Sequence, residues 1–321
     1  MRILAMPKID MKKSVNYLST ASIIVLVGVF TSMNSNFISP ANIKNILSDA
    51  APILAMSMGL TFVLLIGSID LSVGAVCSCA CVMTGTWFPQ LGNWIIPVVL
   101  VYGLLAGLLN GVIFTTLKIP SFIVTLSTMS LWKCAALLIS EGAPQGIPLD
   151  LWPSFRWIKF TFWVIPIVFA ISLAVLGGYY VMQRNTVFGK TVFAVGANER
   201  AARIIGLDVL RTKMLAFVLS GLGSALSGVF FALILKSSLP TIGDQLVLVA
   251  IAAVVLGGTV LTGGKGSVLK TLLGVVLVSV IQNGLNVIAV DAFWQQIVFG
   301  ALIIFAVYLN TDKGDRRVII K

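Results

Sequence analysis

One short segment combines an acidic side chain with the glycines that allow a helix to break. Residues 67–74 read Gly-Ser-Ile-Asp-Leu-Ser-Val-Gly, within an otherwise apolar stretch that runs from 51 to 88. Two glycines permit a sharp turn, and the side chains of Asp70 and Ser72 can accept hydrogen bonds from the first N–H groups of a following helix. Asp70 is therefore either a helix cap or, with Ser72, part of a substrate or gating region.

Uncharged polar side chains recur at helical spacing on apolar segments, which places them on common faces. The first face carries Ser121, Thr125, Thr128 and Trp132, the second carries Ser279, Gln282, Asn283 and Asn286, and Asn110 lies on a third segment. Hydroxyl and amide groups donate and accept hydrogen bonds without a fixed charge, which suits an uncharged polyhydroxylated solute. Hydrogen bonding between neighbouring helices is the alternative interpretation of the same pattern.

Other residue combinations do not favour catalysis or cofactor binding. Cys77, Cys79 and Cys81 alternate along the chain, and helical neighbours two apart point ~200° away from each other, so we expect packing rather than metal binding. The segment 257–266 contains Gly264-Lys265 but lacks the first glycine and the final Ser or Thr of a phosphate-binding loop. The chain also has no histidine. We therefore expect no catalytic residue, no metal, no cofactor and no ATP site in this chain.

The composition defines the environment in which these residues act. The 321 residues are 58% hydrophobic and only 10% charged, with a mean hydropathy of +1.05. An ordinary soluble domain has about 25% charged residues, so a soluble surface cannot be built here. These values exclude a water-soluble enzyme, a nucleic-acid binder and a disordered protein. The chain is predicted to be an integral membrane protein whose first partner is the lipid bilayer.

We expect an all-α polytopic membrane protein that forms a single transmembrane domain over residues 1–321. A helix needs ~20 apolar residues to cross ~30 Å of hydrocarbon, and about ten stretches meet this need. They lie near 17–33, 51–67, 72–89, 94–117, 119–140, 161–182, 212–235, 245–262, 268–290 and 292–310. The run from 51 to 88 would be ~57 Å long as one helix, so we expect it to break at 67–74.

The positive charges predict how these spans are oriented. Most of the 22 Lys and Arg residues fall before residue 17, within 183–213 and after 310, and cytoplasmic loops retain such charges. An even number of spans with both termini in the cytoplasm brings these three regions to one side. Lys133 lies within a span, and its long side chain can reach the outer interface.

Glycines predict close packing and a second interruption. Gly103, Gly107 and Gly111 recur at every fourth position, as expected where two helices approach closely. The segment 257–266 is predicted to be a hinge, and its flanks share a loose pattern with those of 67–74. Either an internal repeat around a transport pathway or independent glycine-rich turns explains this similarity.

A short helix is predicted near 198–205, in the polar segment 183–213. Asn198 is a suitable N-cap, Glu199 complements the positive helix start, and Gly206 is a C-terminal stop. Charged side chains beside the Ile-Ile pair at 204–205 can dock onto a soluble partner. The alternative is a helix that lies on the inner leaflet.

Three motifs carry a resemblance to a known family. They are GSIDLSVGAV at 67–76, FGKTVFAVGANERAARIIGL at 188–207, and AAVVLGGTVLTGGKG at 252–266 followed by QNGLNVI at 282–288. With these motifs in order over nearly the whole chain, the sequence resembles the membrane permease subunits of bacterial ABC sugar importers. The resemblance is greatest to the ribose, xylose and galactoside type, whose relatives also import the autoinducer-2 signal.

The resemblance implies the partners of the chain and its place in the bacterial inner membrane. These are a second permease subunit, identical or related, cytoplasmic subunits that bind the ATP, and a soluble protein that delivers the sugar from outside. The resemblance further implies a coupling helix seated in a groove of the ATPase subunit, formed by Asn198, Glu199, Arg200, Ala201, Ala202 and Arg203. Asp70 belongs, by the same resemblance, to the glycine-flanked acidic turn of the family.

Some positions depart from the family pattern. Val247 and Val249 stand where permeases of this kind commonly have an acidic pair, Lys133 stands where an arginine is usual, and Ala197 replaces a glycine. The missing acidic pair removes the basis for assigning an acidic role at the pathway mouth. It also leaves the choice of sugar open.

We therefore expect a passive translocation pathway for a sugar or sugar-like solute, driven by partner ATPases. The candidate pathway and gating residues are Asp70, Ser72, Asn110, Thr125, Thr128, Gln282, Asn283 and Asn286. A secondary transporter or channel for a small polar solute is the alternative, but ion coupling normally uses paired ionisable groups inside the membrane. Asp70 and Lys133 are expected near opposite interfaces. A membrane enzyme would need a nucleophile–base pair or metal-ligand spacing.

Overall fold

The computed structural model describes residues 11–310, and the predicted cytoplasmic ends at 1–10 and 311–321 lie outside the described residues. The α-helices are α1 (Met11–Met33), α2 (Pro40–Leu65), α3 (Val73–Leu91), α4 (Ile95–Thr116), α5 (Ser121–Ile139), α6 (Ile167–Asn185), α7 (Val187–Ala197), α8 (Glu199–Ile204), α9 (Val209–Leu235), α10 (Leu246–Leu256), α11 (Val268–Val287) and α12 (Ala292–Asn310). The 3-10 helices are η1 (Ser35–Ile38), η2 (Gly92–Trp94) and η3 (Leu149–Lys159). The all-α fold class predicted from the sequence is confirmed.

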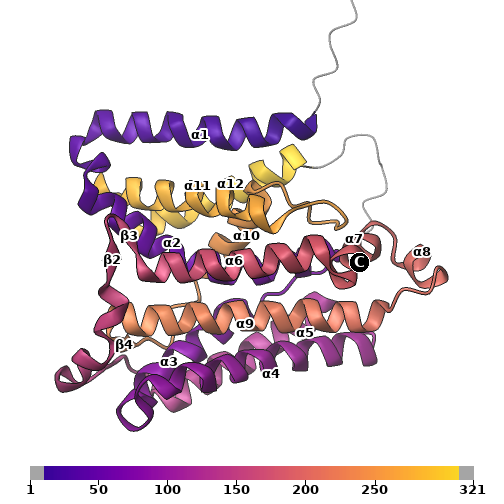
Figure 1. The fold of residues 1–321 in the computed structure, drawn as a ribbon, viewed down its shortest axis with the longest axis horizontal. Helices are drawn as coiled ribbons and strands as arrows, with labels where there is room; N and C mark the ends of the chain where they lie inside the picture. Colours follow the sequence, from indigo (N-terminus) through magenta and orange to yellow (C-terminus); the bar gives the residue numbers. More distant parts are fainter. Residues whose placement is uncertain (1–10, 311–321) are drawn as a thin grey trace, which may run out of the picture.

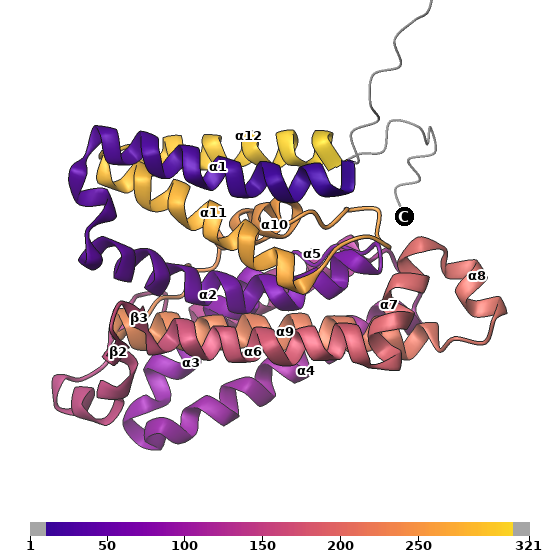
Figure 2. The same ribbon diagram turned by 45° about the horizontal axis from the view of Figure 1, so that its top comes forward.

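The long helices run side by side between two ends of different character (Figure 1). At one end, called here the η3 end, lie η3 and two antiparallel pairs of very short strands. These pairs join β1 (Gln145–Gly146) to β4 (Ser237–Ser238) and β2 (Thr161–Phe162) to β3 (Ile165–Pro166). The opposite end carries the short helices α7 and α8 and is called the α8 end. The described chain ends in α1 and α12 also lie toward the α8 end (Figure 2).

Helix α9 is the central helix because α2, α3 and α4 all pack against it. The predicted packing role of the α4 glycines is borne out by these contacts. A methyl group added at Gly103 would meet Gly221 O at 2.6 Å, and one at Gly111 would meet Met214 Cα at 2.9 Å. Gly107 likewise faces the backbone of Phe217. In lipid, no hydrophobic force drives two helices together, so small residues hold them by letting the two backbones approach closely.

The predicted spans lie where the structure has helices, but their number differs from the number of helices long enough to cross a bilayer. Six stretches are long and apolar enough to cross a bilayer, and one of them, Val73–Thr116, covers both α3 and α4. The apolar helices at Thr20–Met33, Leu246–Leu256 and Phe293–Tyr308 are shorter. Ten transmembrane helices are therefore not confirmed. The clearest difference is at 245–262, where the expected span is an 11-residue helix, ~16 Å long by its rise per residue.

The short helix α10 follows a non-helical segment that runs along α3. Gly85 of α3 packs against Ser238 in β4, and Gly74, near the start of α3, packs against Gly243. The Gly243 N–H also donates to Ser78 Oγ at 2.9 Å. Residues 238–243 thus run along α3 for about three helical turns, ~16 Å. This segment consists of β4 and turn residues, and the expected span at 245–262 is helical only over Leu246–Leu256.

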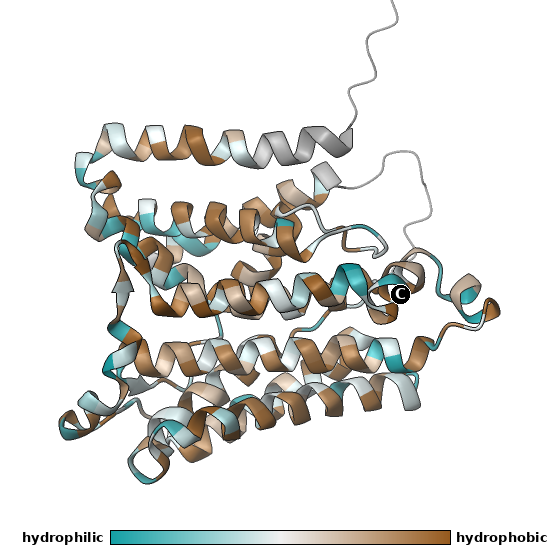
Figure 3. Cartoon of the chain, in the orientation of Figure 1, coloured by the Kyte–Doolittle hydropathy of each residue, from teal (hydrophilic) through white to brown (hydrophobic). Residues whose placement is uncertain are grey.

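The outer surface of the helices is apolar, as expected for contact with lipid. Hydrophobic residues dominate the middle of the long helices, and hydrophilic ones gather toward the two ends (Figure 3). Leu138 is 81% exposed, and Phe293 and Ile304 are 76% and 74% exposed. Such exposure of large apolar side chains is favourable in hydrocarbon. The chain is built to be surrounded by lipid or by other apolar helices.

Candidate functional site

Asp70 is at the centre of a buried hydrogen-bond network in the break between α2 and α3. Its Oδ1 accepts bonds from the backbone N–H of Ser72 at 3.0 Å and from Ser72 Oγ at 2.6 Å. Its Oδ2 accepts a bond of 2.7 Å from Ser220 Oγ on α9. Asp70 and Ser72 are each 1% exposed, and Ser220 is 0% exposed. The carboxylate is therefore held by three donors from two elements that are far apart in the sequence.

The network continues into α4 and α5. Asn110 Nδ2 of α4 donates to Ser72 Oγ at 2.8 Å, and Thr128 Oγ1 of α5 donates to Asn110 Oδ1 at 2.7 Å. Thr125 Oγ1 accepts a bond of 3.1 Å from the Leu71 N–H of the break itself. The structure thus brings together five predicted pathway residues: Asp70, Ser72, Asn110, Thr125 and Thr128.

The position of this network bears on the two alternatives raised for Asp70, a helix cap and a substrate or gating region. Ser220 lies ~16 Å along α9 from Val209, so the network lies well inside the helical layer and not at its edge. Ser72 is the N-cap residue of α3 but makes no side-chain capping bond. The five residues are at most 5% exposed, so they do not line an open cavity in this structure. Together with Ser220 they form the Asp70 network, which holds the break against α4, α5 and α9.

The second polar stripe lies on a different helix pair and does not join this network. Asn283 of α11 exchanges hydrogen bonds of 2.8 and 3.1 Å with Asn42 of α2. Asn286 Oδ1 accepts a bond of 2.7 Å from Gln295 of α12, and Gln282 is half-buried on the same helix. These contacts favour the interhelical interpretation for Asn283 and Asn286. The two polar stripes do not form one solute-binding face within this chain.

The two glycine interruptions end their helices in the same way. Ser68 N–H donates to Val63 O and Gly67 N–H to Leu64 O, while Gly67 has a φ of 73°. The same pair of bonds recurs from Thr259 and Gly258 after α10, with Gly258 at φ 86°. This is a helix end that requires a left-handed residue, which glycine supplies without strain. Local chemistry explains the pattern shared by the two interruptions.

The interruptions also meet each other, at the α8 end of the molecule. The Gly264 N–H donates to Leu65 O at 2.8 Å, and a methyl group on Gly263 would meet Gly67 N at 2.6 Å. Gly196, near the end of α7, packs directly on Leu65 O and the backbone of Gly264. We call the backbone contact between 65–67, 196–197 and 262–264 the glycine junction. It joins both breaks to the residues just before α8.

Helix α8 projects from this end as the sequence predicts. Asn198 Oδ1 accepts a bond of 3.0 Å from the Ala201 N–H, which confirms the N-cap, and Gly206 ends the helix with φ 82°. Glu199 forms ion pairs with Arg203 at 3.2 Å and with Lys213 at 2.8 Å.

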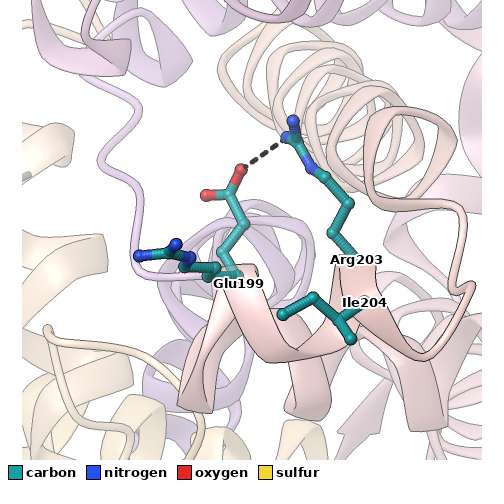
Figure 4. Close-up of a pocket in the computed structure, with 4 residues that line it drawn as sticks. Glu199, Arg203 and Ile204 are labelled. Atoms are coloured by element: carbon teal, nitrogen blue, oxygen red, sulfur yellow. Dashed lines mark hydrogen bonds and ion pairs between the residues drawn. The ribbon is translucent and has the colours of Figure 1, made fainter.

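The surface of α8 combines charged and apolar groups. Glu199, Arg200, Arg203 and Ile204 line an open depression (Figure 4). Ile204 and Ile205 are 78% and 72% exposed. Charges of both signs beside two exposed isoleucines make a surface suited to a protein partner, because a protein interface buries apolar side chains within a charged rim.

Two residues of this architecture carry contacts that the sequence did not reveal. Ser220 lies among small residues on α9, and nothing in its spacing indicates a bond to Asp70. Asp244 lies in no recognisable motif, yet its carboxylate pairs with Lys133 at 2.7 Å. The three alternating cysteines are buried and unpaired with one another. Within the part of the chain that the structure describes, no cluster of His, Cys, Asp or Glu can hold a metal ion.

The fold and its long apolar helices define a multi-pass membrane protein, and comparison with known proteins gives the family. The chain belongs to the family described as branched-chain amino acid transport system / permease component, whose model matches residues 42–307. This is a family of transport permeases and not of enzymes.

Individual relatives resemble the chain over most of its length. The ribose import permease protein RbsC of Haemophilus influenzae is 36% identical, over 94% of each chain. RbsC of Bacillus subtilis is 35% identical over 90% of this chain and 91% of its own. The galactose/methyl galactoside import permease protein MglC of Haemophilus influenzae is 30% identical over 92% of this chain and 94% of its own. These matches agree with the family resemblance noted from the motifs.

A solved structure supports the fold. It is described as a metal-chelate type ABC transporter in an inward-facing conformation, and it covers 94% of this chain and 99% of its own with a TM-score of 0.51. The two sequences are 15% identical, so this match concerns the fold alone.

Proposed function

We propose that this chain forms the translocation pathway of an ATP-driven importer for ribose or a closely similar sugar. The observation that carries the proposal is the identity of 36% and 35% to two ribose import permeases over at least 90% of this chain. The sequence has no histidine, the residue most often used to shuttle protons, which suits an ATP-driven importer rather than a proton-coupled carrier.

The pathway requires partners, of which the cytoplasmic ATPase is the most specific. We assign its docking surface to residues 198–203, with Glu199, Arg200 and Arg203 as the polar contacts. Support comes from the projection of α8 beyond the helical layer and from the exposed Ile204 and Ile205 beside these charges. A second permease, identical or related, and a soluble sugar-binding protein at the η3 end complete the importer.

The glycine junction offers a route from the docking surface to the pathway. A displacement of α8 moves the end of α7, where Gly196 contacts both Leu65 and Gly264 through backbone atoms. Direct backbone contacts transmit a displacement from one segment to the next, because a closely packed interior has low compressibility. The break at 66–72 then moves together with the Asp70 network, which connects the break to α4, α5 and α9. The Asp70 network is thus a gating element and not a sugar-binding surface.

The orientation follows from the same assignment. The α8 end is cytoplasmic, as are both termini, because the α7–α9 region carries many of the basic residues and the described ends of α1 and α12 lie toward it. To test this, Arg200→Cys in a Cys134→Ser background is labelled in intact cells and in inside-out vesicles with a membrane-impermeant maleimide. Labelling only in inside-out vesicles is expected. Labelling in intact cells would reverse the orientation and remove the docking assignment.

The choice of sugar is tested by transport. The chain is reconstituted in proteoliposomes with its ATPase subunit and sugar-binding protein, and uptake of radiolabelled ribose is measured with unlabelled ribose, xylose or galactose as competitor. Competition by ribose but not by galactose is expected. ATP-dependent uptake of radiolabelled galactose, without uptake of radiolabelled ribose, would overturn the ribose assignment and keep the importer.

A further inference from the structure

An ion pair lies in the half of α5 that is nearest its C-terminal end. Lys133 Nζ of α5 is 2.7 Å from Asp244 Oδ2, and the two side chains remain 42% and 38% exposed. Lys133 lies ~18 Å from the start of α5 at Ser121 and ~9 Å from its end at Ile139. The pair is therefore within the apolar segment and not at a polar helix end.

Asp244 is held in place by the backbone around it. Its N–H donates to Thr241 O at 3.1 Å, and the adjacent Gly243 is fixed to α3 through Ser78 Oγ at 2.9 Å and through close packing on Gly74. These contacts anchor the turn that leads into α10. The carboxylate is thus presented to α5 by a rigid part of the fold.

An exposed ion pair within an apolar segment indicates whether lipid, protein or water surrounds it. Each charged side chain placed in the hydrocarbon costs about 2.5–3.5 kcal/mol on insertion scales, so intramembrane charges face protein or water. Within this chain the pair is only half covered, and Gln245 and Ser130 beside it are also exposed. Uncharged polar groups next to the pair extend the hydrophilic surface. This part of α5 and the start of α10 therefore face away from lipid.

We propose that the Lys133–Asp244 pair faces the aqueous pathway and contacts the sugar as it passes. The proposal rests on the proposed function and adds the place where the solute meets the chain. A sugar presents adjacent hydroxyls that each donate and accept, so one can accept from the ammonium while its neighbour donates to the carboxylate. The pair also keeps both charges compensated when no sugar is present, which an isolated lysine or aspartate would not.

The first test measures water access on two faces of α5. Lys133→Cys and Leu131→Cys are made in the Cys134→Ser background, which removes the exposed native thiol. Leu131 is a matched control because it is 50% exposed and lies ~200° around the helix from Lys133. Each variant is treated in membranes with a charged methanethiosulfonate. Modification at 133 and not at 131 is expected, whereas equal protection at both positions means that a second permease or lipid covers the pair and overturns the proposal.

The second test asks whether the charges matter for transport. Lys133→Gln and Asp244→Asn are expected to lower the maximal rate of ATP-driven ribose uptake about tenfold, the change for ~1.4 kcal/mol, and to leave the amount of assembled complex unchanged. The double variant Lys133→Asp with Asp244→Lys restores the pair and is expected to recover part of the rate. Asp208→Asn is the control, because it neutralises one half of another exposed ion pair, Asp208–Arg211, outside the apolar segments.

The outcomes separate this proposal from the proposed function. If the native complex takes up sugar with ATP but Lys133→Gln and Asp244→Asn transport normally, the pair does not contact the sugar and only this inference fails. If the native complex shows no ATP-driven sugar uptake, the proposed function fails, whatever the labelling gives. Reduced assembly of the single variants, without recovery in the exchanged double variant, would make the pair a packing contact and overturn the inference.

Discussion

Ser220 of α9 donates a hydrogen bond of 2.7 Å to the carboxylate of Asp70, across 150 residues of sequence. The bond ties the break between α2 and α3 to the central helix. Because Asp70 also accepts two bonds from Ser72, and Ser72 accepts from Asn110, a change at any one of them affects how the break is fixed. This connectivity gives the first prediction.

Asp70→Asn should preserve the break, whereas Asp70→Ala should loosen it. Asparagine keeps an oxygen for the two bonds from Ser72, and its amide can donate to Ser220 Oγ. Alanine leaves buried donors without an acceptor, at about 1–3 kcal/mol for each. We expect the thermal midpoint of the purified protein to fall strongly for Asp70→Ala and little for Asp70→Asn. Equal destabilisation by both variants would mean that the negative charge, and not hydrogen bonding, stabilises the break.

Gly196→Ala should disrupt the glycine junction. The added methyl group would overlap Leu65 O and the Gly264 backbone, which have no flexible side chain to yield. We expect ATP-driven uptake to be lost while the ATPase subunit still co-purifies, because α8 itself is unchanged. Gly177→Ala on α6 is the matched control, since a methyl group there meets nothing within 4 Å. Normal uptake by Gly196→Ala would show that the junction does not transmit movement.

Glu199→Arg should uncouple ATP hydrolysis from transport: we expect hydrolysis to continue while uptake is lost. The change places three cationic side chains together, because Arg203 and Lys213 now pair with Glu199. Partly exposed ion pairs contribute only about 0–1 kcal/mol, so the fold should survive. The measurement compares ATPase co-purification, ATP hydrolysis and uptake in one preparation. A variant that binds the ATPase and transports normally would remove residues 198–203 from the docking surface.

The Asn42–Asn283 pair should stabilise the fold without taking part in transport. Side-chain hydrogen bonds between membrane helices contribute about 0.6 kcal/mol on average. We therefore expect Asn42→Ala and Asn283→Ala each to lower the thermal midpoint slightly, with no further loss in the double variant and an unchanged uptake rate. A large fall in uptake by Asn283→Ala alone would return this residue to the pathway.

Much of this arrangement could be predicted from the sequence because it depends on local chemistry. The glycine-flanked break at 67–74, the Asn198 cap and the close packing of Gly103, Gly107 and Gly111 all follow from short-range rules. The convergence of Asp70, Ser72, Asn110, Thr125 and Thr128 also follows in part, since each is a polar group on an apolar segment that needs a partner.

The remainder depends on tertiary contacts. The course of residues 238–243 beside α3 could not be predicted, because it depends on contacts with Gly74, Ser78 and Gly85 and not on a local pattern. Asp244 and Ser220 gain their roles from residues more than a hundred positions away. The sequence leaves Asn283 open between a pathway face and a helix contact, because a polar stripe has the same spacing in both.

The energy source for uptake tests the central claim most directly. Proteoliposomes that contain this chain, its ATPase and the sugar-loaded binding protein are assayed with internal ATP, with a proton gradient but no ATP, and with the ATPase omitted. We expect ribose uptake only with both ATP and the ATPase, and the same rate when an uncoupler collapses the gradient. Uptake by this chain alone, or uptake that follows the gradient, would contradict the account.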